Sequence, residues 1–441
     1  MTGSTALLTD RYELTMLQAA LADGTADRRC VFEVFSRRLP AGRRYGVVAG
    51  TGRVLDGLAD FRFGPGELAW LDEQHVVDDR TLAWLESYRF TGQVHGYAEG
   101  EVFLPASPVL VVEGTFAEAV VLETFVLSVL NYDSAVASAA SRMTTAAGDR
   151  PCLEMGARRA NEDAAVAASR AAVVGGFAAT SLLEAGRRYG LPTIGTAAHA
   201  FTLLHDDEPT AFASQVASQG PGTTLLVDTY DVHRGVERAL AAAGTGLGAV
   251  RLDSGDLGVL AHEVRAQLDA AGATGTRIVV TSDLDEFAIA ALASAPVDTY
   301  GVGTSLVTGS GHPTCGMVYK LVAREDASGA LRPVAKASTS KTSQGGRKTA
   351  ARRLGPDGCA VEEVVVTGPD EAVRSWRPAD DSLRPLLVPL VEDGTVLPGL
   401  TGAEGVRRAA DRHTRSRAEL PRSSRRLSAD EPGVPTVLLE L

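Results

Sequence analysis

Apolar residues recur along the chain with two different spacings, and the spacing changes near residue 116. Residues 30–40, CVFEVFSRRLP, hold a run of β-branched and aromatic residues that Pro40 stops, a pattern typical of a strand. Three further short β-like runs, QVHGYA, EVFLPA and PVLVVEG, begin within residues 92–110. These patterns predict a β-rich half-domain over about residues 1–110.

From residue 116 onward, a long helical segment ends near Met143, and β-like and helical patterns then alternate. The alternating segments are CLEMG with a helix over 160–174, LPTIGT, TTLLVDTY with HRGVERALAAAG, GAVRLDSGD with VLAHEVRAQLDAAG, TRIVVTSD with EFAIAALAS, and VDTYGVGTSL. Repeated strand–helix units predict right-handed crossovers and a parallel sheet. No G-x-G-x-x-G follows the first strand, so a barrel-like closure is favoured over an open dinucleotide-binding sheet. In a barrel, polar residues at the carboxyl ends of the strands carry the chemistry.

The composition excludes several classes of protein. The 441 residues include 43 basic and 55 acidic side chains, a net charge of -12 that argues against a generic nucleic-acid binder. Four widely separated cysteines without a C-x-x-C pair exclude a zinc ribbon and a thioredoxin-type motif. The most apolar stretch, residues 117–130, is interrupted by two glutamates and fits an amphipathic helix better than a membrane span. The first residues lack the features of a signal peptide, so we expect a cytoplasmic protein.

The last part of the chain is basic and polar from about Val334. The segment from Arg407 to Arg426 is rich in arginine, with only Asp411 and Glu419 as acids. Its simplest interpretation is a solvated helix face, and binding of nucleic acid through a local basic patch is the alternative.

The segment RLDSGDL carries the densest group of candidate residues. Asp253, Ser254 and Asp256 follow an apolar strand, and such carboxylates can hold ribose hydroxyls or a magnesium-bound diphosphate. Arg251 adds a planar fork that can grip a carboxylate or a phosphate. The alternative is a capping turn, in which Asp253 or Asp256 caps the following helix.

Two further segments favour anion binding. GVGTSLVTGSG begins at Gly301, and its glycines let backbone N–H groups approach an anion, with a hydroxyl from Thr304 beside Gly303. EMGARRANED places Arg158 and Arg159 directly after a predicted strand. An ordinary glycine turn and a solvated helix start are the respective alternatives. In TSDLDEF, we expect Ser282 or Asp283 to cap the following helix.

Two segments each contain one residue that can be structural or functional. TIGTAAHAF places Thr196 at a strand end and His199 three residues later, where a histidine can act as a base, a nucleophile or a ligand, or be structural. No H-x-H or H-E-x-x-H pattern occurs, so metal ligation by histidine is not expected. TDRYELTML predicts a helix capped by Thr9 or Asp10, with Tyr12 in the core or stacking on an aromatic ligand. Together the strand ends favour an enzyme acting on a phosphorylated, sugar-containing small molecule.

Ten ordered segments resemble the nicotinate phosphoribosyltransferase family over about residues 7–350, and the arginine-rich tail is also of that family's kind. The segments are TDRYELTM, VFEVFSRRLPAGRRYGVVAG, LNYDSAVASAASRM, EMGARRA, GTAAHAF, DTYDVHRGVERAL, RLDSGDL, TSDLDEFAI, DTYGVGTSLVT and GMVYKLV. The resemblance implies the reaction of nicotinate, 5-phosphoribosyl 1-diphosphate (PRPP), ATP and water to nicotinate mononucleotide, diphosphate, ADP and phosphate. This reaction belongs to NAD biosynthesis by nicotinate salvage, and the family requires Mg²⁺.

The resemblance also implies an architecture. We expect an irregular α/β barrel of the type II phosphoribosyltransferase kind over residues 113–335. A second, sandwich-like α+β domain is expected from both chain ends, residues 1–112 and 336–441, including the basic helical tail. The family further implies a homodimer whose partners are the small-molecule substrates, with no nucleic acid and no membrane.

Site residues follow from the matched segments. His199 matches the histidine that ATP transiently phosphorylates, and Tyr12 matches the aromatic residue that stacks on the pyridine ring, commonly across a dimer interface. Thr196 and Arg251 match nicotinate-contacting positions, with Arg251 expected on the carboxylate. Gly303 and Thr304 match the PRPP-contacting segment, and we expect Asp253, Asp256 and Arg158 near the ribose and diphosphate from their strand-end positions. No metal ligand is assigned.

Some residues depart from the family pattern, and other functions stay open. Ala200 stands where the family frequently has serine, which removes one hydroxyl contact, and the segment SGHPTC (310–315) has no interpretation. A phosphoribosyltransferase for nicotinamide or quinolinate is the nearest alternative. A non-catalytic sensor of NAD precursors on the same fold is the alternative from another class, although it would be expected to lack His199 or the strand-end acids.

Overall fold

The computed structural model describes residues 4–336 and 344–441 and divides into two compact units. Unit 1 comprises Met1–Ser138 and His312–Leu441, and unit 2 comprises Ala139–Gly311. Unit 2 covers fewer residues than the range 113–335 expected for the barrel. The difference has a physical reason, because the strands on either side of unit 2 pair within the antiparallel sheet of unit 1 and not with the barrel strands.

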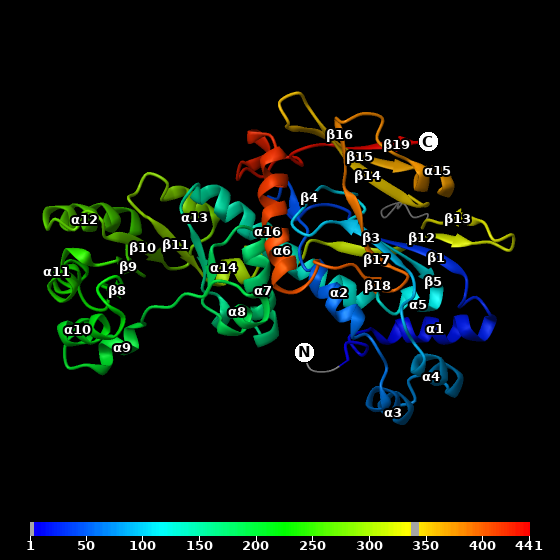
Figure 1. Cartoon of the computed structure of the whole chain (residues 1–441), viewed down its shortest axis with the longest axis horizontal. Coiled ribbons are helices and arrows are strands. Elements are labelled where there is room, and N and C mark those ends of the chain that lie inside the picture. Colours follow the sequence, from blue (N-terminus) through cyan, green and yellow to red (C-terminus); the bar gives the residue numbers. More distant parts are fainter. Residues whose placement is uncertain (1–3, 337–343) are drawn as a thin grey trace. The chain divides into compact units, whose positions relative to one another are not determined.

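The larger sheet of unit 1 is antiparallel, and both ends of the chain contribute strands to it (Figure 1). β1 lies between β5 and β12, and β3 pairs with β17, so the predicted assembly from both chain ends is confirmed. In spatial order the strands are β13 (Leu331–Pro333), β12 (Met317–Glu325), β1 (Arg29–Ser36), β5 (Leu110–Thr115), β3 (Gln93–Tyr97), β17 (Leu387–Glu392) and β18 (Thr395–Val396).

Two smaller sheets complete the β structure of unit 1. The four-stranded sheet has the order β16 (Leu383–Pro385), β14 (Lys348–Leu354), β15 (Ala360–Thr367) and β19 (Thr436–Glu440), and a two-stranded sheet joins β2 (Gly46–Val47) to β4 (Val102–Phe103). β19 is parallel to β15, so the last residues of the chain are held in a sheet.

The helices of unit 1 that precede residue 139 bury apolar residues in one core with residues of the large sheet, and the described part of the unit holds three further helices near the end of the chain. They are α1 (Arg11–Asp23), α2 (Thr51–Ala59), α3 (Pro65–Glu73), α4 (Asp79–Glu86), α5 (Phe116–Val120), the first part of α6 (Glu123–Ala147), α15 (Asp370–Ser375), α16 (Gly402–Glu419) and the short η3 (Arg422–Arg425). Phe116–Ala147 is long and apolar enough to cross a membrane by length and composition, but 67% of its most apolar window is buried within the protein. Its burial fits a core helix.

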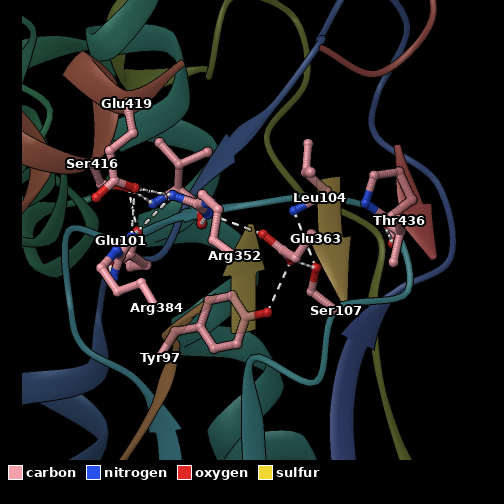
Figure 2. Close-up of polar contacts among 12 residues, drawn as sticks. Tyr97, Glu101, Leu104, Ser107, Arg352, Glu363, Arg384, Ser416, Glu419 and Thr436 are labelled. Atoms are coloured by element: carbon pink, nitrogen blue, oxygen red, sulfur yellow. Dashed lines mark hydrogen bonds and ion pairs between the residues drawn. The ribbon is translucent and has the colours of Figure 1, made fainter. Parts of the chain in front are cut away.

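A buried group of charges joins the small sheet to α16. We call it the ion cluster: Glu101, Arg352, Glu363, Arg384 and Glu419 (Figure 2). Arg352 is fully buried and donates to Glu101 at 2.9 Å, to Glu363 at 3.0 Å and to Glu419 at 3.0 Å. The hydroxyls of Ser416 and Tyr97 add hydrogen bonds to Glu101 and Glu363, respectively.

Unit 2 is built around six parallel strands. Their spatial order is β7 (Ala179–Thr180), β6 (Cys152–Glu154), β11 (Thr299–Val302), β10 (Arg277–Thr281), β9 (Ala249–Leu252) and β8 (Thr224–Leu226). This is the strand order of an open barrel in which β7 and β8 are the two edge strands. The predicted irregular α/β barrel is confirmed. The strand expected at LPTIGT is wrong. That segment forms only one isolated bridge, between Thr193 and Thr180, and this leaves the ring of strands open.

Helices follow the strands of unit 2 as predicted, with three additions. The region between β7 and β8 holds α8 (Leu183–Tyr189), α9 (His199–Leu204) and α10 (Glu208–Gln219), none of which the sequence pattern predicted. The other helices are the remainder of α6, η1 (Ala157–Arg159), α7 (Glu162–Val174), α11 (Val232–Ala243), η2 (Gly244–Gly246), α12 (Leu257–Ala270), α13 (Glu286–Ala291) and α14 (Thr304–Val307).

The two faces of the barrel sheet differ in the way that strand alternation predicts. Val250 and Leu252 of β9 are fully buried, whereas Arg251 between them lines a cavity inside the ring. That cavity is about 630 Å³, and residues from both ends of the strands, among them Pro151 and Met155, line it. The interior of the barrel is therefore hollow enough to accept a small planar ligand.

Candidate active site

The carboxyl ends of neighbouring parallel strands bring five of the predicted site residues to one small cavity. β10 lies between β9 and β11, and β11 pairs with β6, so the loops that follow these strands meet at the same edge. The cavity is about 230 Å³. It is lined by Met155, Arg158, Arg159, Arg251, Asp253, Thr281, Ser282, Asp283, Gly301, Gly303 and Thr304.

A close approach of two backbone segments shapes this cavity. A Cβ on Gly156 would lie 2.8 Å from the carbonyl oxygen of Gly303, so glycine is required where the β6 and β11 loops touch. Arg158 and Arg159 next to Gly156 are exposed and line the cavity, where their guanidinium groups can reach an anion.

Arg251 is held in place by three protein groups. Its Nε donates to the Thr281 hydroxyl at 2.9 Å, its Nη2 to Asp253 at 2.9 Å, and its Nη1 to the carbonyl of Ala197 at 3.3 Å. A guanidinium has five N–H groups, so two remain for a ligand. Burial raises the pKa of Asp253, but hydrogen bonds from Thr281 and Arg251 outweigh it, and the pKa lies below its usual value. Asp253 is therefore an ionised carboxylate in this cavity.

His199 is the first residue of α9, and its ring lies between a hydroxyl and two carboxylates. Nδ1 is 3.1 Å from the Thr229 hydroxyl. Nε2 lies 3.8 Å from Asp228 Oδ1 and 3.9 Å from Asp253 Oδ2, distances that are electrostatic and too long for hydrogen bonds. The side chain of His199 is 40% exposed, so a ligand can reach the ring beside the two carboxylates.

Asp228 is a site residue that the sequence reasoning missed. Its Oδ2 accepts hydrogen bonds from the Asp253 amide and the Ser254 hydroxyl, both at 2.8 Å. Its Oδ1 is buried and has no hydrogen-bond partner among the described residues, and this is the oxygen that faces His199. The signal was present, because TTLLVDTY places this aspartate at a strand end. Only the fold shows that it faces the histidine.

Thr196 lies beside the hollow interior of the barrel. It lines the 630 Å³ cavity together with Arg251, Ile194 and Val279. Arg251 also lines the 230 Å³ cavity, so its guanidinium lies where the two cavities approach each other.

Asp256 and the segment TSDLDEF provide or adjoin helix caps, and the role of Tyr12 stays a prediction. The Asp256 side chain accepts from the amide of Val259 at 3.1 Å and so caps α12, which is the structural alternative. The cap of α13 is Asp285, with bonds to two amides, and not Ser282 or Asp283. Tyr12 belongs to α1 in unit 1.

The helix of Tyr12 begins at the predicted place, with Asp10 at the N-cap position but without a side-chain cap hydrogen bond. The Tyr12 side chain is 46% exposed, which leaves a ring face available. Partial burial and the neighbouring Glu123 raise the pKa of its hydroxyl, so the phenol stays protonated.

The small cavity offers carboxylates that could hold a cation together with substrate oxygens. Within residues 4–336 and 344–441, no three histidine, cysteine or acidic side chains converge as a metal cage. The small cavity nevertheless has two carboxylates on its wall, Asp253 and Asp283. One or two carboxylates completed by phosphate oxygens and water is the arrangement that Mg²⁺ prefers.

Comparison with known proteins identifies close relatives. A sequence model described as the nicotinate phosphoribosyltransferase (NAPRTase) N-terminal domain matches residues 7–131. The chain is 55% identical to nicotinate phosphoribosyltransferase pncB1 of Mycobacterium tuberculosis, over 98% of this chain and 94% of that protein. It is 38% identical to nicotinate phosphoribosyltransferase of Bacillus subtilis, over 73% and 68%. The crystal structure of human nicotinic acid phosphoribosyltransferase superposes with a TM-score of 0.83 at 26% identity, covering 98% and 97%.

Proposed function

The chain belongs to the nicotinate phosphoribosyltransferase family, and from this premise we propose how its residues divide the work of the reaction. It is an enzyme of NAD biosynthesis that joins nicotinate to the phosphoribosyl group of PRPP. The reaction consumes ATP and water with nicotinate and PRPP, and releases nicotinate mononucleotide, diphosphate, ADP and phosphate. The observation that carries the proposal is the position of His199, half exposed beside two carboxylates.

His199 accepts the γ-phosphoryl group of ATP at Nε2. When Nδ1 carries the proton and donates to Thr229, the lone pair of Nε2 is free to attack phosphorus. The bond from phosphorus to the bridging oxygen breaks, and ADP leaves. The ring gains positive charge during this step, and the carboxylates of Asp228 and Asp253, 3.8 and 3.9 Å from Nε2, stabilise that charge. Water later hydrolyses the phosphohistidine to phosphate.

The 230 Å³ cavity binds the phosphates of PRPP. Arg158, with Thr304 and the backbone at Gly303, faces its 5-phosphate and diphosphate groups, and Asp253 lies close enough to hold ribose hydroxyls. Mg²⁺ supplies charge neutralisation for the leaving diphosphate, and Asp253 or Asp283 would hold it. Cleavage of the C1–O bond gives an oxocarbenium-like centre, as in glycoside cleavage, which an ionised Asp253 stabilises. Asp256 has no part in this step.

Nicotinate enters the hollow barrel beside Thr196. The two N–H groups of Arg251 that the protein leaves unused bind its carboxylate, and this separates nicotinate from the neutral nicotinamide. Tyr12 stacks on the pyridine ring from the partner subunit of a homodimer in the cytoplasm. The phosphate on His199 adds negative charge near Asp253 of the small cavity, and it orders the arginines into a tighter PRPP-binding state.

The experiment measures nicotinate mononucleotide formation with and without ATP, with nicotinamide tested in parallel. ATP should stimulate the wild-type enzyme with release of ADP, and His199→Ala should lose the stimulation while keeping ATP-independent turnover. His233→Ala, a change at an exposed histidine on α11, is the matched control. Equal ATP stimulation in His199→Ala would reject the phosphohistidine, and product from nicotinamide would reject the role of Arg251.

A further inference from the structure

The arginine-rich tail places three guanidinium groups on one cavity in unit 1. Arg408, Arg412 and Arg415 lie four and three residues apart on α16, a spacing that puts them on one helix face. All three line a cavity of about 440 Å³. Every residue that lines it belongs to unit 1, and none of them belongs to the reaction site of unit 2.

These arginines have few acidic partners within the protein. The carboxylates of Glu101 and Glu419 are taken by Arg352 and Arg384, as Figure 2 shows. Arg412 reaches Glu101 only at 3.9 Å, and its guanidinium donates no hydrogen bond within the described residues.

The other two arginines of this helix face, Arg408 and Arg415, can also bind a ligand. Arg415 is exposed and has neither an ion pair nor a hydrogen bond in the described part of the chain. Arg408 has an exposed pair with Glu404 at 3.3 Å and a bond to the carbonyl of Gly399 at 3.2 Å. Exposed pairs of this kind contribute little and are easily exchanged for a ligand.

The rest of the cavity is mostly apolar. Its lining includes Ala98, Val388, Pro389, Leu390, Leu400 and Ala409. Two acids also line it. Glu99 accepts hydrogen bonds from the amides of Gly50 at 2.6 Å and Gly52 at 3.0 Å, which offset its charge, and Asp411 is exposed. The three guanidiniums outnumber these two carboxylates.

We propose that this cavity is a second ligand site and that it binds a nucleoside monophosphate. The apolar floor accepts a base and sugar, and a volume of about 440 Å³ is within the range of small-molecule sites. Arg412 and Arg415 bind the phosphate, because their unused N–H groups match its oxygens. The proposal does not depend on the proposed reaction mechanism.

The test is calorimetric titration of the full chain with AMP, in the presence of Mg²⁺ and saturating PRPP but without nicotinate or ATP. PRPP then fills the reaction site and no turnover occurs. We expect one equivalent of AMP to bind, and Arg415→Gln and Arg412→Gln each to weaken it by about tenfold or more, the usual effect of removing a charged hydrogen bond. Since Arg415 is exposed, Arg415→Gln tests the site without disturbing the core.

Two control variants distinguish AMP binding in this cavity from attraction to the helix charge and from binding at the reaction site. Arg407→Gln removes the same charge from α16 at an exposed residue that does not line the cavity, and His199→Ala alters the reaction site. Both variants should bind AMP as the wild type does. Adenosine should not bind, since it lacks the phosphate.

Four results would overturn the proposal. They are no AMP binding, equal loss in Arg407→Gln and Arg415→Gln, loss in His199→Ala, and adenosine binding as tightly as AMP. Binding of a single-stranded oligonucleotide without any binding of AMP would also overturn it, and would assign these arginines to nucleic acid.

Discussion

Two regions of this protein gather arginines and carboxylates, and they do so in opposite ways. In the ion cluster of unit 1, Arg352 and Glu363 are fully buried and bonded to each other, with further hydrogen bonds from Tyr97 and Ser107 to the same glutamate. Of the two arginines in that cluster, only the Nε atoms lack an acceptor among the described residues.

The reaction site of unit 2 is incomplete by comparison. Asp228 has a buried oxygen without a hydrogen bond, and His199 is 40% exposed and stands almost 4 Å from two carboxylates. Buried polar groups are normally satisfied, so an unsatisfied carboxylate facing an accessible histidine indicates a place kept for a ligand. Satisfied charges hold the fold, and the partly satisfied charges are the ones to which we assign the chemistry.

The largest expected effect is on stability, from Arg352→Met. Removing this arginine leaves Glu101 and Glu363 buried without their main counter-charge, which costs about 3–5 kcal/mol of unfolding free energy. Arg353→Met is the matched control, because the pair of Arg353 with Glu362 is partly exposed and such pairs contribute about 0–1 kcal/mol. Urea unfolding of both variants measures the difference. Similar losses of unfolding free energy in the two variants would show that the buried ion cluster stabilises the fold no more than a partly exposed pair.

The next effect is on catalysis, from Asp253→Asn. Loss of the charge that faces both His199 and Arg251 should lower kcat/KM by about 10²–10³-fold, the usual effect of removing one electrostatic stabiliser. The melting temperature should change little, because this aspartate is partly exposed. Asp256→Asn, three residues later, removes a charge but keeps an oxygen that can cap α12, and it should leave kcat/KM within a few-fold. A comparable loss in both variants would contradict the proposed division of roles.

A smaller effect is expected from Asp228→Asn. Its carboxylate supports the charge on His199 from 3.8 Å, so the ATP-stimulated rate should fall by about 10–100-fold, in the range found for groups that support a reacting residue. The ATP-independent rate should be retained. Asp231→Asn, at the exposed N-cap of α11, is the control. A pulse with radiolabelled ATP would report phosphohistidine directly, and an undiminished label in Asp228→Asn would refute the role.

Much of the reaction site could be predicted from the sequence, because strand-end motifs are local. RLDSGDL, GVGT and EMGARR each place their polar residues just past a strand, and parallel strands bring these ends together. The choice between Asp253 and Asp256 could not be made, since a cap and a ligand require the same residue type. Asp228 was missed because its partner is 29 residues away and comes from α9, a helix that the sequence pattern did not predict.

The ion cluster could not be predicted from the sequence. Arg352 and Glu101 are 251 residues apart, and neither stands in a motif that points to the other. Only the pairing of strands from both chain ends brings them together.

The smallest expected effect is on the pH dependence of the unfolding free energy. It comes from His413 of α16, which is buried, whereas His199 is accessible. Burial and the neighbouring Arg417 lower the pKa of His413 to about 3, and Glu101 only partly opposes this. Its pKa in the unfolded chain is about 6.5, so between these values the unfolded state binds a proton that the folded state does not. The contribution is therefore fully present above pH 6.5 and is lost as the pH falls toward 3, at about 1.4 kcal/mol per pH unit.

Between pH 7.5 and 5.5, His413 should thus account for about 1.4 kcal/mol of lost unfolding free energy. His413→Met fills a similar volume without a titrating group and should lose about that much less than the wild type over the same interval. Denaturant unfolding at the two pH values measures the difference. An identical pH dependence in the two proteins would mean that the folded state admits a protonated His413.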